Sequence, residues 1–273
     1  MAKGKRTLSS KESKLILQLE WDKKRVIALR DIKDILKCSE GYAREIAHTL
    51  KNKQWLETIE PGHYILISAD RGIEPVVPEM NPYIISKILN ESYYFAYRIA
   101  CLYHGLITQI PSIIHIVLKK RKQPIRLKNI EFHFIKITSH KFFGWREVNL
   151  YGERINITNL EKTAIDSIDK PNLIGGIEET TRVLHRASKK INWNKLKSYI
   201  SKMNSSTLSR RLGYLLNILK VEFPNEFEDF LLSKVKKDKA YLDSPLRWGK
   251  SGKKDKKWNL IINVSYKELT AEI

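Results

Sequence analysis

Cysteine is scarce in this sequence: among 273 residues only Cys38 and Cys101 are present. Two cysteines exclude a disulfide-rich scaffold and a zinc site built from cysteines. Histidines do not replace them, because those outside residues 39–52 lack the spacing of zinc ligands. We therefore predict no metal, no cofactor and a reducing, cytoplasmic setting.

Long hydrophobic runs are also missing. No stretch of about 18 apolar residues occurs, which is the minimum for a transmembrane helix. The basic residues of Met1–Arg6 are not followed by an apolar segment, so we expect no secretory signal there. The sequence therefore predicts no membrane partner.

Acidic residues are few relative to basic ones. Lys and Arg number 50 and Asp and Glu number 30, which gives a formal net charge of +20. Such a charge favours a polyanionic partner, nucleic acid first, whereas a lysine-rich surface that merely aids solubility is the alternative. Hydrophobic residues at 42% and aromatic residues at 10% are ordinary for a globular chain, and the length favours two domains.

Catalytic signatures are absent as well. The sequence has neither a Gly-x-Ser-x-Gly elbow nor a phosphate-binding P-loop. Gly175-Gly176 invites comparison with nucleotidyltransferases, but the two metal-binding acids do not follow, and a sharp turn into a helix explains the pair better. We predict no catalytic residue and no enzyme. A metal-dependent nuclease using Glu161, Asp166 and Asp169 stays open as an alternative, although no Asp/Glu-x-Lys strand motif accompanies these acids.

Residues 1–68 are predicted to form a winged helix-turn-helix. Ser9 and Glu12 make a capping box at the start of a first helix. The apolar spacing of residues 29–36 predicts a second helix, and Ser39 is a suitable N-cap for a third. Short extended segments at 26–27, 58–60 and 64–68, the last two joined by a Pro-Gly turn, complete the order typical of a winged helix.

The outward face of the third helix is the predicted DNA-reading surface, since its inward face is apolar. Arg44 is the best candidate to read guanine, and the turn at Gly62 would bring a wing towards the minor groove. Winged helices also serve as protein–protein modules, which is the alternative. The predicted DNA-binding residues are Ser39, Glu40, Tyr42, Arg44, His48, Lys51, Lys53, Gly62 and His63.

Proline residues mark a linker at 69–82, after which residues 83–273 are predicted to form a larger mixed α/β domain. We expect the whole chain to be α+β. The predicted elements of this domain are a helix over 83–103, strands at 113–118, 130–137, 145–150 and 155–157, and helices at 159–169, 176–189, 193–202 and 206–220.

Two basic runs lie in this second part. Lys119, Lys120, Arg121 and Lys122 form a possible phosphate patch, and a basic C-terminal tail extends over 234–257. Each run is equally compatible with a solvated loop.

Several stretches resemble the AbiEi family of antitoxins and transcriptional autoregulators from type IV, abortive-infection toxin–antitoxin systems. In the first part these are a Trp-Leu pair at the end of the winged helix and residues 61–66. In the second part they are residues 103–111, the most specific stretch at 155–166, and Leu212–Leu216. Residue Lys162 departs from the family, which usually has arginine there.

The resemblance implies a repressor that binds inverted repeats in its own promoter and counteracts a nucleotidyltransferase-like toxin, as a monomer or a weak dimer that pairs on DNA. Such an antitoxin, active against phage infection, catalyses no reaction itself. A stand-alone regulator without a toxin is the alternative. The motif residues, which are expected to be structural or toxin-related, are Glu161, Lys162, Thr163, Asp166, Gly175 and Gly176.

Overall fold

The computed structural model describes residues 6–69 and 81–271. Most of the predicted linker at 69–82 therefore lies outside the described residues. Packing divides the chain into two compact units. The first comprises 1–91 with 124–131 and 150–153, and the second comprises 92–123, 132–149 and 154–273.

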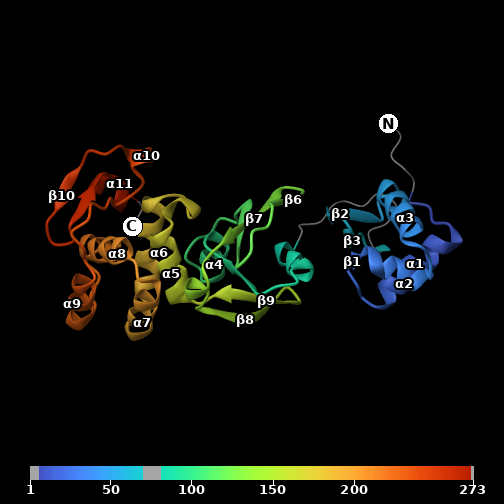
Figure 1. Ribbon diagram of the computed structural model, residues 1–273, viewed down its shortest axis with the longest axis horizontal. Helices are drawn as coiled ribbons and strands as arrows, with labels where there is room; N and C mark the ends of the chain where they lie inside the picture. The colour runs from blue at the N-terminus through green and yellow to red at the C-terminus, as the bar shows by residue number, and fades with distance from the viewer. Residues whose placement is uncertain (1–5, 70–80, 272–273) are drawn as a thin grey trace. The chain divides into compact units, whose positions relative to one another are not determined.

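The first unit begins with three helices that surround one apolar core (Figure 1). Their bounds are α1 (Ser10–Trp21), α2 (Leu29–Leu36) and α3 (Glu40–Asn52). The predicted capping box of α1 is confirmed, because the Ser9 amide donates to Glu12 at 2.6 Å and the Glu12 amide donates back to the Ser9 hydroxyl. The predicted N-cap of α3 is confirmed too, since the Ser39 hydroxyl accepts from the amide of Tyr42.

A short turn separates α2 from α3. Lys37 closes α2 in the left-handed conformation with φ of 49°. Ala43 and Ala47 on α3 are fully buried, and side chains this small let the helix axes approach closely. The turn and the small residues thus set how α3 packs on α2. The face of α3 opposite Ala43 and Ala47 is left towards solvent.

A three-stranded antiparallel sheet in the order β1-β3-β2 completes this helical part. The strands are β1 (Val26–Ala28), β2 (Leu56–Glu60) and β3 (His63–Leu66). Gly62 adopts φ of 82° in the turn between β2 and β3, a conformation that costs glycine little. The hairpin therefore projects just where the Pro-Gly turn predicted it.

The second sheet has six strands in the order β6-β7-β5-β4-β9-β8. Strand β4 pairs antiparallel with β5 and parallel with β9. The bounds are β4 (Tyr93–Ala96), β5 (Ile113–Leu118), β6 (Ile125–Leu127), β7 (Ile130–Lys136), β8 (Trp145–Leu150) and β9 (Glu153–Thr158).

The predicted helix over 83–103 is wrong in its central part. A 3₁₀ segment, η2 (Pro82–Ile88), precedes strand β4, and only α4 (Arg98–Tyr103) is α-helical. Strand β4 is buried along its whole length. A strand that is buried on both faces does not alternate polar and apolar residues. The sequence pattern of residues 93–96 therefore could not distinguish a strand from a helix.

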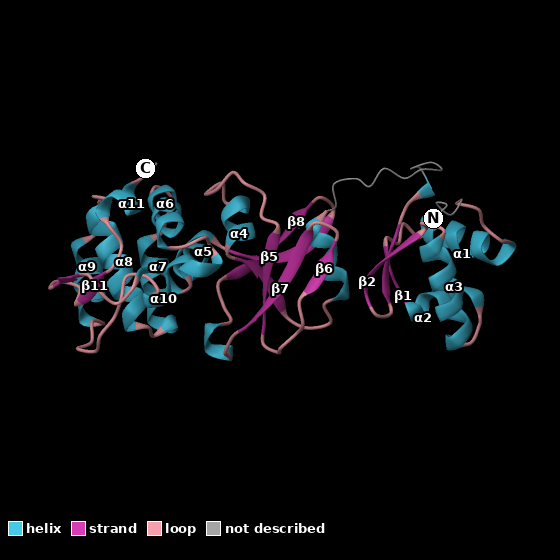
Figure 2. Cartoon of the chain, turned by 90° about the horizontal axis from the view of Figure 1, so that it is seen from above, coloured by secondary structure: helices cyan, strands magenta, loops and turns pink. Residues whose placement is uncertain are grey.

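Helices and one small two-stranded sheet form the rest of the second unit, and the helices lie beside the six-stranded sheet (Figure 2). They pack around one large core that includes Trp258 and Leu212. The remaining elements are η3 (Ser139–Lys141), α5 (Leu160–Asp169), η4 (Pro171–Leu173), α6 (Ile177–Ser188), α7 (Trp193–Met203), α8 (Ser206–Ile218), α9 (Asn225–Ser233), α10 (Pro245–Trp248), β10 (Lys253–Asp255), β11 (Leu260–Ile262) and α11 (Tyr266–Thr270).

Separate helices and sheets in this order make the chain an α+β protein, as predicted. The basic segment 234–257 is folded, because its end pairs as the antiparallel hairpin β10–β11. Arg210, which is fully buried, holds the start of the segment by donating to the carbonyls of Lys236 and Asp238. Across residues 6–69 and 81–271, no helix is long and apolar enough to cross a membrane.

Candidate nucleic-acid interface

The outward face of α3 carries the predicted reading residues. Arg44 and Glu40 lie one turn apart and form an ion pair at 2.5 Å, with their side chains 69% and 54% exposed. An exposed pair of this kind is worth only a few tenths of a kcal/mol, about 0.3–0.5. The Arg44 guanidinium can therefore exchange Glu40 for a base edge or a phosphate at little cost.

Two further residues of this face are partly engaged by neighbours. The ring of Tyr42 is half-buried and lies under the Lys11 ammonium at 4.9 Å from the ring centroid. His48 is exposed, and its Nδ1 lies 3.4 Å from the amide nitrogen of Asn52. Both side chains stay near the surface of α3, so the face combines hydrogen-bonding and apolar groups as base readout requires.

The two lysines at the end of α3 are placed differently from each other. Lys51 is exposed. Lys53 instead donates to both carboxylate oxygens of Glu12, at 2.9 and 2.7 Å. Burial opposes the ionisation of Glu12, but the hydrogen bonds from Lys53 and Ser9 outweigh it and lower the pKa of that carboxyl. Lys53 thus joins the start of α1 to the end of α3.

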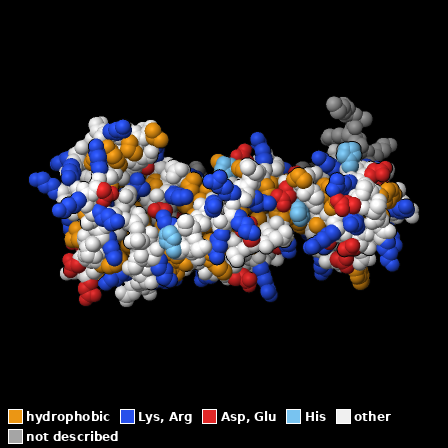
Figure 3. Space-filling view, viewed as in Figure 1, with side chains coloured by type: hydrophobic (Ala, Val, Ile, Leu, Met, Phe, Trp, Pro, Cys, Tyr) orange, Lys and Arg blue, Asp and Glu red, His pale blue; other side chains and the backbone are white. Residues whose placement is uncertain are grey.

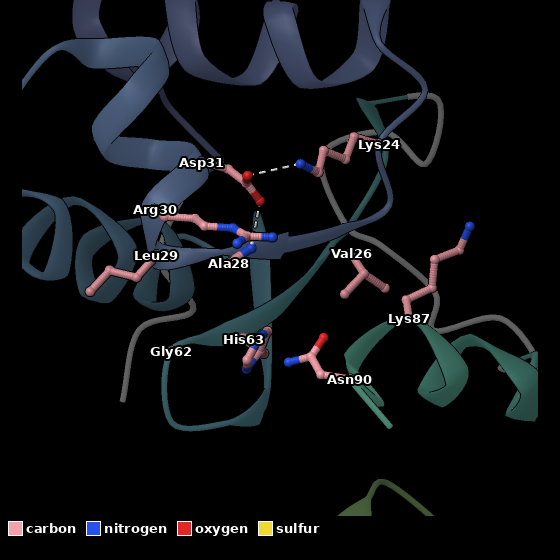
Figure 4. Close-up of a pocket in the computed structure, with 10 residues that line it drawn as sticks. All are labelled: Lys24, Val26, Ala28, Leu29, Arg30, Asp31, Gly62, His63, Lys87 and Asn90. Carbon is pink, nitrogen blue, oxygen red and sulfur yellow. Dashed lines mark hydrogen bonds and ion pairs between the residues drawn. The ribbon is translucent and has the colours of Figure 1, made fainter. Parts of the chain in front are cut away.

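The turn of the hairpin β2–β3 borders an open pocket of about 360 Å³ (Figure 4). Asp31 accepts from the amide of Ala28 at 2.7 Å and pairs with Lys24 at 2.8 Å, which caps α2 at this wall. Gly62 and His63 line the pocket from the hairpin. The Nδ1 atom of His63 lies 3.4 Å from Glu60. The predicted wing residues therefore sit at the N-terminal end of α2.

The basic run at 119–122 belongs to the second unit. Lys119 and Lys122 lie over the rings of Phe142 and Phe134, at 4.9 and 5.6 Å from the ring centroids. Basic side chains are scattered over the visible face of both units and outnumber acidic ones there (Figure 3). The positive charge is thus spread widely and does not single out α3.

Comparison with known proteins gives a structural relative. No family model matches the chain. No curated protein matches it either. The crystal structure of the RV2827C protein from Mycobacterium tuberculosis is similar, with a TM-score of 0.69 over 95% of this chain and 94% of that chain at 16% sequence identity. At this identity the likeness shows the fold alone.

The motif residues of α5 are almost all inside the protein. Lys162 and Asp166 are 1% and 4% exposed and form an ion pair one helical turn apart. The Lys162 ammonium also lies 5.2 Å from the ring centroid of Phe143. Burial raises the pKa of Asp166, although Lys162 opposes that shift. Enclosed in this way, Asp166 lacks the open face that the nuclease alternative needs.

Neighbouring motif residues join separate elements. Asn159 caps α5 and donates from its side chain to the Tyr199 hydroxyl at 2.9 Å. Glu161 pairs with Lys195 at 2.9 Å and accepts from the Asn192 amide at 3.2 Å. The hydroxyl of Thr163 donates to the Asn159 carbonyl at 2.8 Å. These contacts tie α5 to α7.

The motif stretches at 103–111 and 155–166 meet at one hydrogen bond. The Nε2 atom of His104 donates to the Thr158 carbonyl at 2.8 Å. Burial lowers the pKa of His104, which keeps the ring neutral. The sequence placed His104 in one of the resembling stretches without giving it a role, and its pairing became visible in the fold.

The glycine pair begins α6, as predicted. Gly175 and Gly176 adopt φ of 122° and 111°, which residues with a side chain rarely adopt. A Cβ on Gly176 would lie 1.8 Å from an Arg247 guanidinium nitrogen, and Arg247 pairs with Glu178 through two contacts of 2.8 Å. The pair therefore makes room for a contact between α6 and α10. Within the described residues, no group of three or more His, Cys, Asp or Glu is placed to hold a metal ion.

Proposed function

We propose that residues 1–68, within the first unit, form a winged helix-turn-helix that reads duplex DNA through α3. The supporting observation is the position of Arg44, exposed on a helix whose opposite face is fully packed against α1 and α2. A major groove admits one α-helix, and the side chains that point away from the protein core then face the base edges. The hairpin β2–β3 is the wing of this proposal.

Each predicted contact has a separate task. Arg44 reads a guanine, with Tyr42 and His48 beside it on the same face, and Ser39 and Glu40 lie at the start of the helix. Lys51 contacts the phosphate backbone, and Gly62 with His63 approaches the adjacent minor groove. Lys53 supports the helix through Glu12 and touches DNA only if that pair opens.

We further propose that the chain is a cytoplasmic AbiEi-type antitoxin that represses its own operon and performs no reaction itself. Its binding sites are inverted repeats, occupied by two monomers or a weak dimer. The second unit then counteracts a nucleotidyltransferase-like toxin. In this proposal the motif residues of α5, which are buried, hold the second unit together and do not contact the toxin.

A binding titration tests the DNA proposal. Fluorescence anisotropy at about 0.2 M salt, where non-specific phosphate binding is strongly weakened, compares the DNA upstream of this gene with a shuffled duplex of equal composition. Binding confined to the upstream DNA supports an autoregulator. Equal and weak binding to both duplexes contradicts sequence-specific reading.

A second assay tests the antitoxin proposal. The chain is co-expressed with a nucleotidyltransferase-like protein encoded next to its gene, and growth is measured. Restored growth supports the antitoxin. Persistent toxicity together with specific operator binding favours a stand-alone regulator.

A further inference from the structure

A strip of aromatic rings in the second unit is lined by lysines that have no role in the proposed reading of duplex DNA. The aromatic strip consists of Phe142, Phe143, Trp145 and Tyr199. Phe142 and Phe143 follow η3 directly, Trp145 begins β8, and Tyr199 lies on α7. The centroids of Phe142 and Trp145 are 6.3 Å apart, and those of Phe143 and Tyr199 are 5.0 Å apart.

The rings are fixed from the protein side. Trp145 is 39% exposed, and the other three rings of the aromatic strip are half-buried. Phe142 packs on the buried ring of Tyr94 at 5.0 Å between centroids. Phe143 rests on the buried ammonium of Lys162, and the Tyr199 hydroxyl accepts from Asn159. The rings are therefore held in place before any ligand arrives, which lowers the entropic cost of stacking on them.

Lysine ammonium groups occupy the outer side of these rings. Lys202 lies over Phe143 and Tyr199, at 5.4 and 5.8 Å from their centroids, and Lys119 lies over Phe142 at 4.9 Å. Both lysines are exposed. A cation held over a ring at an exposed site is bound weakly, by about 0.5–1 kcal/mol, so another flat group can replace it.

Negative charge is sparse around the strip. Residues 193–203 contain three lysines and no acid, and residues 139–147 contain Glu147 against Lys141 and Arg146. Of the acids nearby, Glu161 is buried and paired with Lys195, and Asp169 is paired with Lys141 at 3.5 Å, while Glu147 is exposed. The surface is therefore suited to a ligand that carries both negative charge and flat rings.

We propose that the aromatic strip binds single-stranded nucleic acid. Unpaired bases stack on the rings, and the displaced ammonium groups of Lys119 and Lys202 turn to the phosphates between those bases. Duplex DNA does not fit this mode, because its bases stack on each other and turn their faces inward. The inference goes beyond the reading of an operator by α3 and uses different residues.

The test is an anisotropy titration of the full chain with labelled oligonucleotides of about 12 nucleotides, within the 4–16 that such surfaces cover. Oligo-U and oligo-dT are the probes, and a hairpin duplex of the same length is the comparison. We expect both single strands to bind more tightly than the duplex. Tighter binding of oligo-U than of oligo-dT then identifies RNA as the ligand. Equal binding of the two supports a surface that accepts RNA and DNA single strands alike.

Trp145→Ala is the main variant, because this ring is the most exposed of the aromatic strip. Loss of one stacked base weakens binding about 5- to 150-fold, from the usual 1–3 kcal/mol per base. In the double variant Lys119→Ala with Lys202→Ala, we expect the affinity for oligonucleotides to depend less steeply on salt, because two phosphate contacts are lost. The matched controls are Tyr266→Ala, which removes a ring that is 60% exposed elsewhere in the second unit, and Lys267→Ala. Tyr199→Phe keeps its ring and should bind like the wild type.

Several outcomes overturn the proposal. Unchanged oligonucleotide affinity in Trp145→Ala, or a loss in Lys267→Ala equal to that in Lys119→Ala with Lys202→Ala, reduces the surface to general positive charge. Preference for the duplex, or binding to phosphatidylglycerol vesicles in place of oligonucleotides, also contradicts it. Arg44→Ala separates this proposal from operator reading, since it should weaken operator binding and leave oligo-U binding unchanged.

Discussion

At the residue scale, the proposed reading of DNA by α3 depends most on Arg44. Its guanidinium is exposed and forms an exposed ion pair with Glu40, so it is available to a base. We expect Arg44→Ala to cost about 1–3 kcal/mol in binding to the operator and to relax the preference at one base position. Competition anisotropy with single-base operator variants measures this. An equal loss on random DNA would make Arg44 a phosphate contact.

Glu12 makes the stability of the first unit depend on pH. Its pKa is lowered in the folded protein, so its ionised form stabilises the fold above the ordinary value of 4.5, and that contribution is lost as the pH falls from there through the lowered pKa. Lys53→Ala should cost about 1–3 kcal/mol at neutral pH, because a carboxylate with 3% exposure loses its partner.

Denaturant unfolding between neutral pH and pH 3, followed in the wild type and in Glu12→Gln, checks the pH effect. The difference between the two proteins should shrink as the pH falls. A constant difference would show that Glu12 acts only through packing. Lys51→Ala, an exposed lysine on the same helix, is the control and should change stability little.

Gly213 explains part of one motif stretch by packing alone. A Cβ at this position on α8 would lie 2.2–2.4 Å from the ring of Trp258, which is 1% exposed. We expect Gly213→Ala to destabilise the protein by about 1–3 kcal/mol, the usual cost of overpacking. Thermal unfolding of the variant measures it.

Gly41→Ala is the matched control, because Gly41 also lies inside a helix but has nothing within 4 Å of an added Cβ. Alanine there should stabilise by about 0.5–1 kcal/mol through helix propensity. Equal effects of the two substitutions would refute the role given to Trp258.

At the scale of elements, α5 depends on its buried ion pair. Removal of one partner from a buried pair costs about 3–5 kcal/mol, because the other charge stays buried and unpaired. Lys162→Met should therefore destabilise strongly, and Lys162→Met with Asp166→Leu should recover most of the loss. A double-mutant cycle in denaturant gives the coupling energy. If the losses in unfolding free energy were additive, the two side chains would stabilise α5 only by packing and not through their ion pair.

The sequence allowed most elements of this chain to be predicted, and the reason differs between elements. The capping box of α1 and the N-cap of α3 are local, since their partners lie three residues apart. The amphipathic helices α6 to α8 show one apolar face. Strand β4 was missed because both of its faces are buried, and burial on two sides depends on elements distant in sequence.

The candidate interface was predictable to a lesser extent. The outward face of α3 follows from its periodicity. The engagement of Lys53 by Glu12 spans 41 positions of the chain and has no local signal. The aromatic strip likewise joins residues near 142 with Tyr199, and no spacing in the sequence places these rings together. Such contacts need the fold.

At the scale of the whole molecule, two polyanionic partners are proposed for a chain with a net charge of +20. One is duplex DNA at α3, and the other is single-stranded nucleic acid at the aromatic strip. Both uses depend on salt, because each phosphate that is contacted releases counterions. The two proposals differ in specificity, since α3 would read base edges and the aromatic strip would offer stacking faces.

The most direct measurement is the anisotropy titration of the upstream DNA against its shuffled counterpart at about 0.2 M salt, with the full chain. The proposed winged helix predicts binding to the upstream duplex at least about 1000-fold tighter than to the shuffled one, the lower range for specific readers. Equal affinity for the two duplexes would contradict it, and the charge of this protein would then serve another partner.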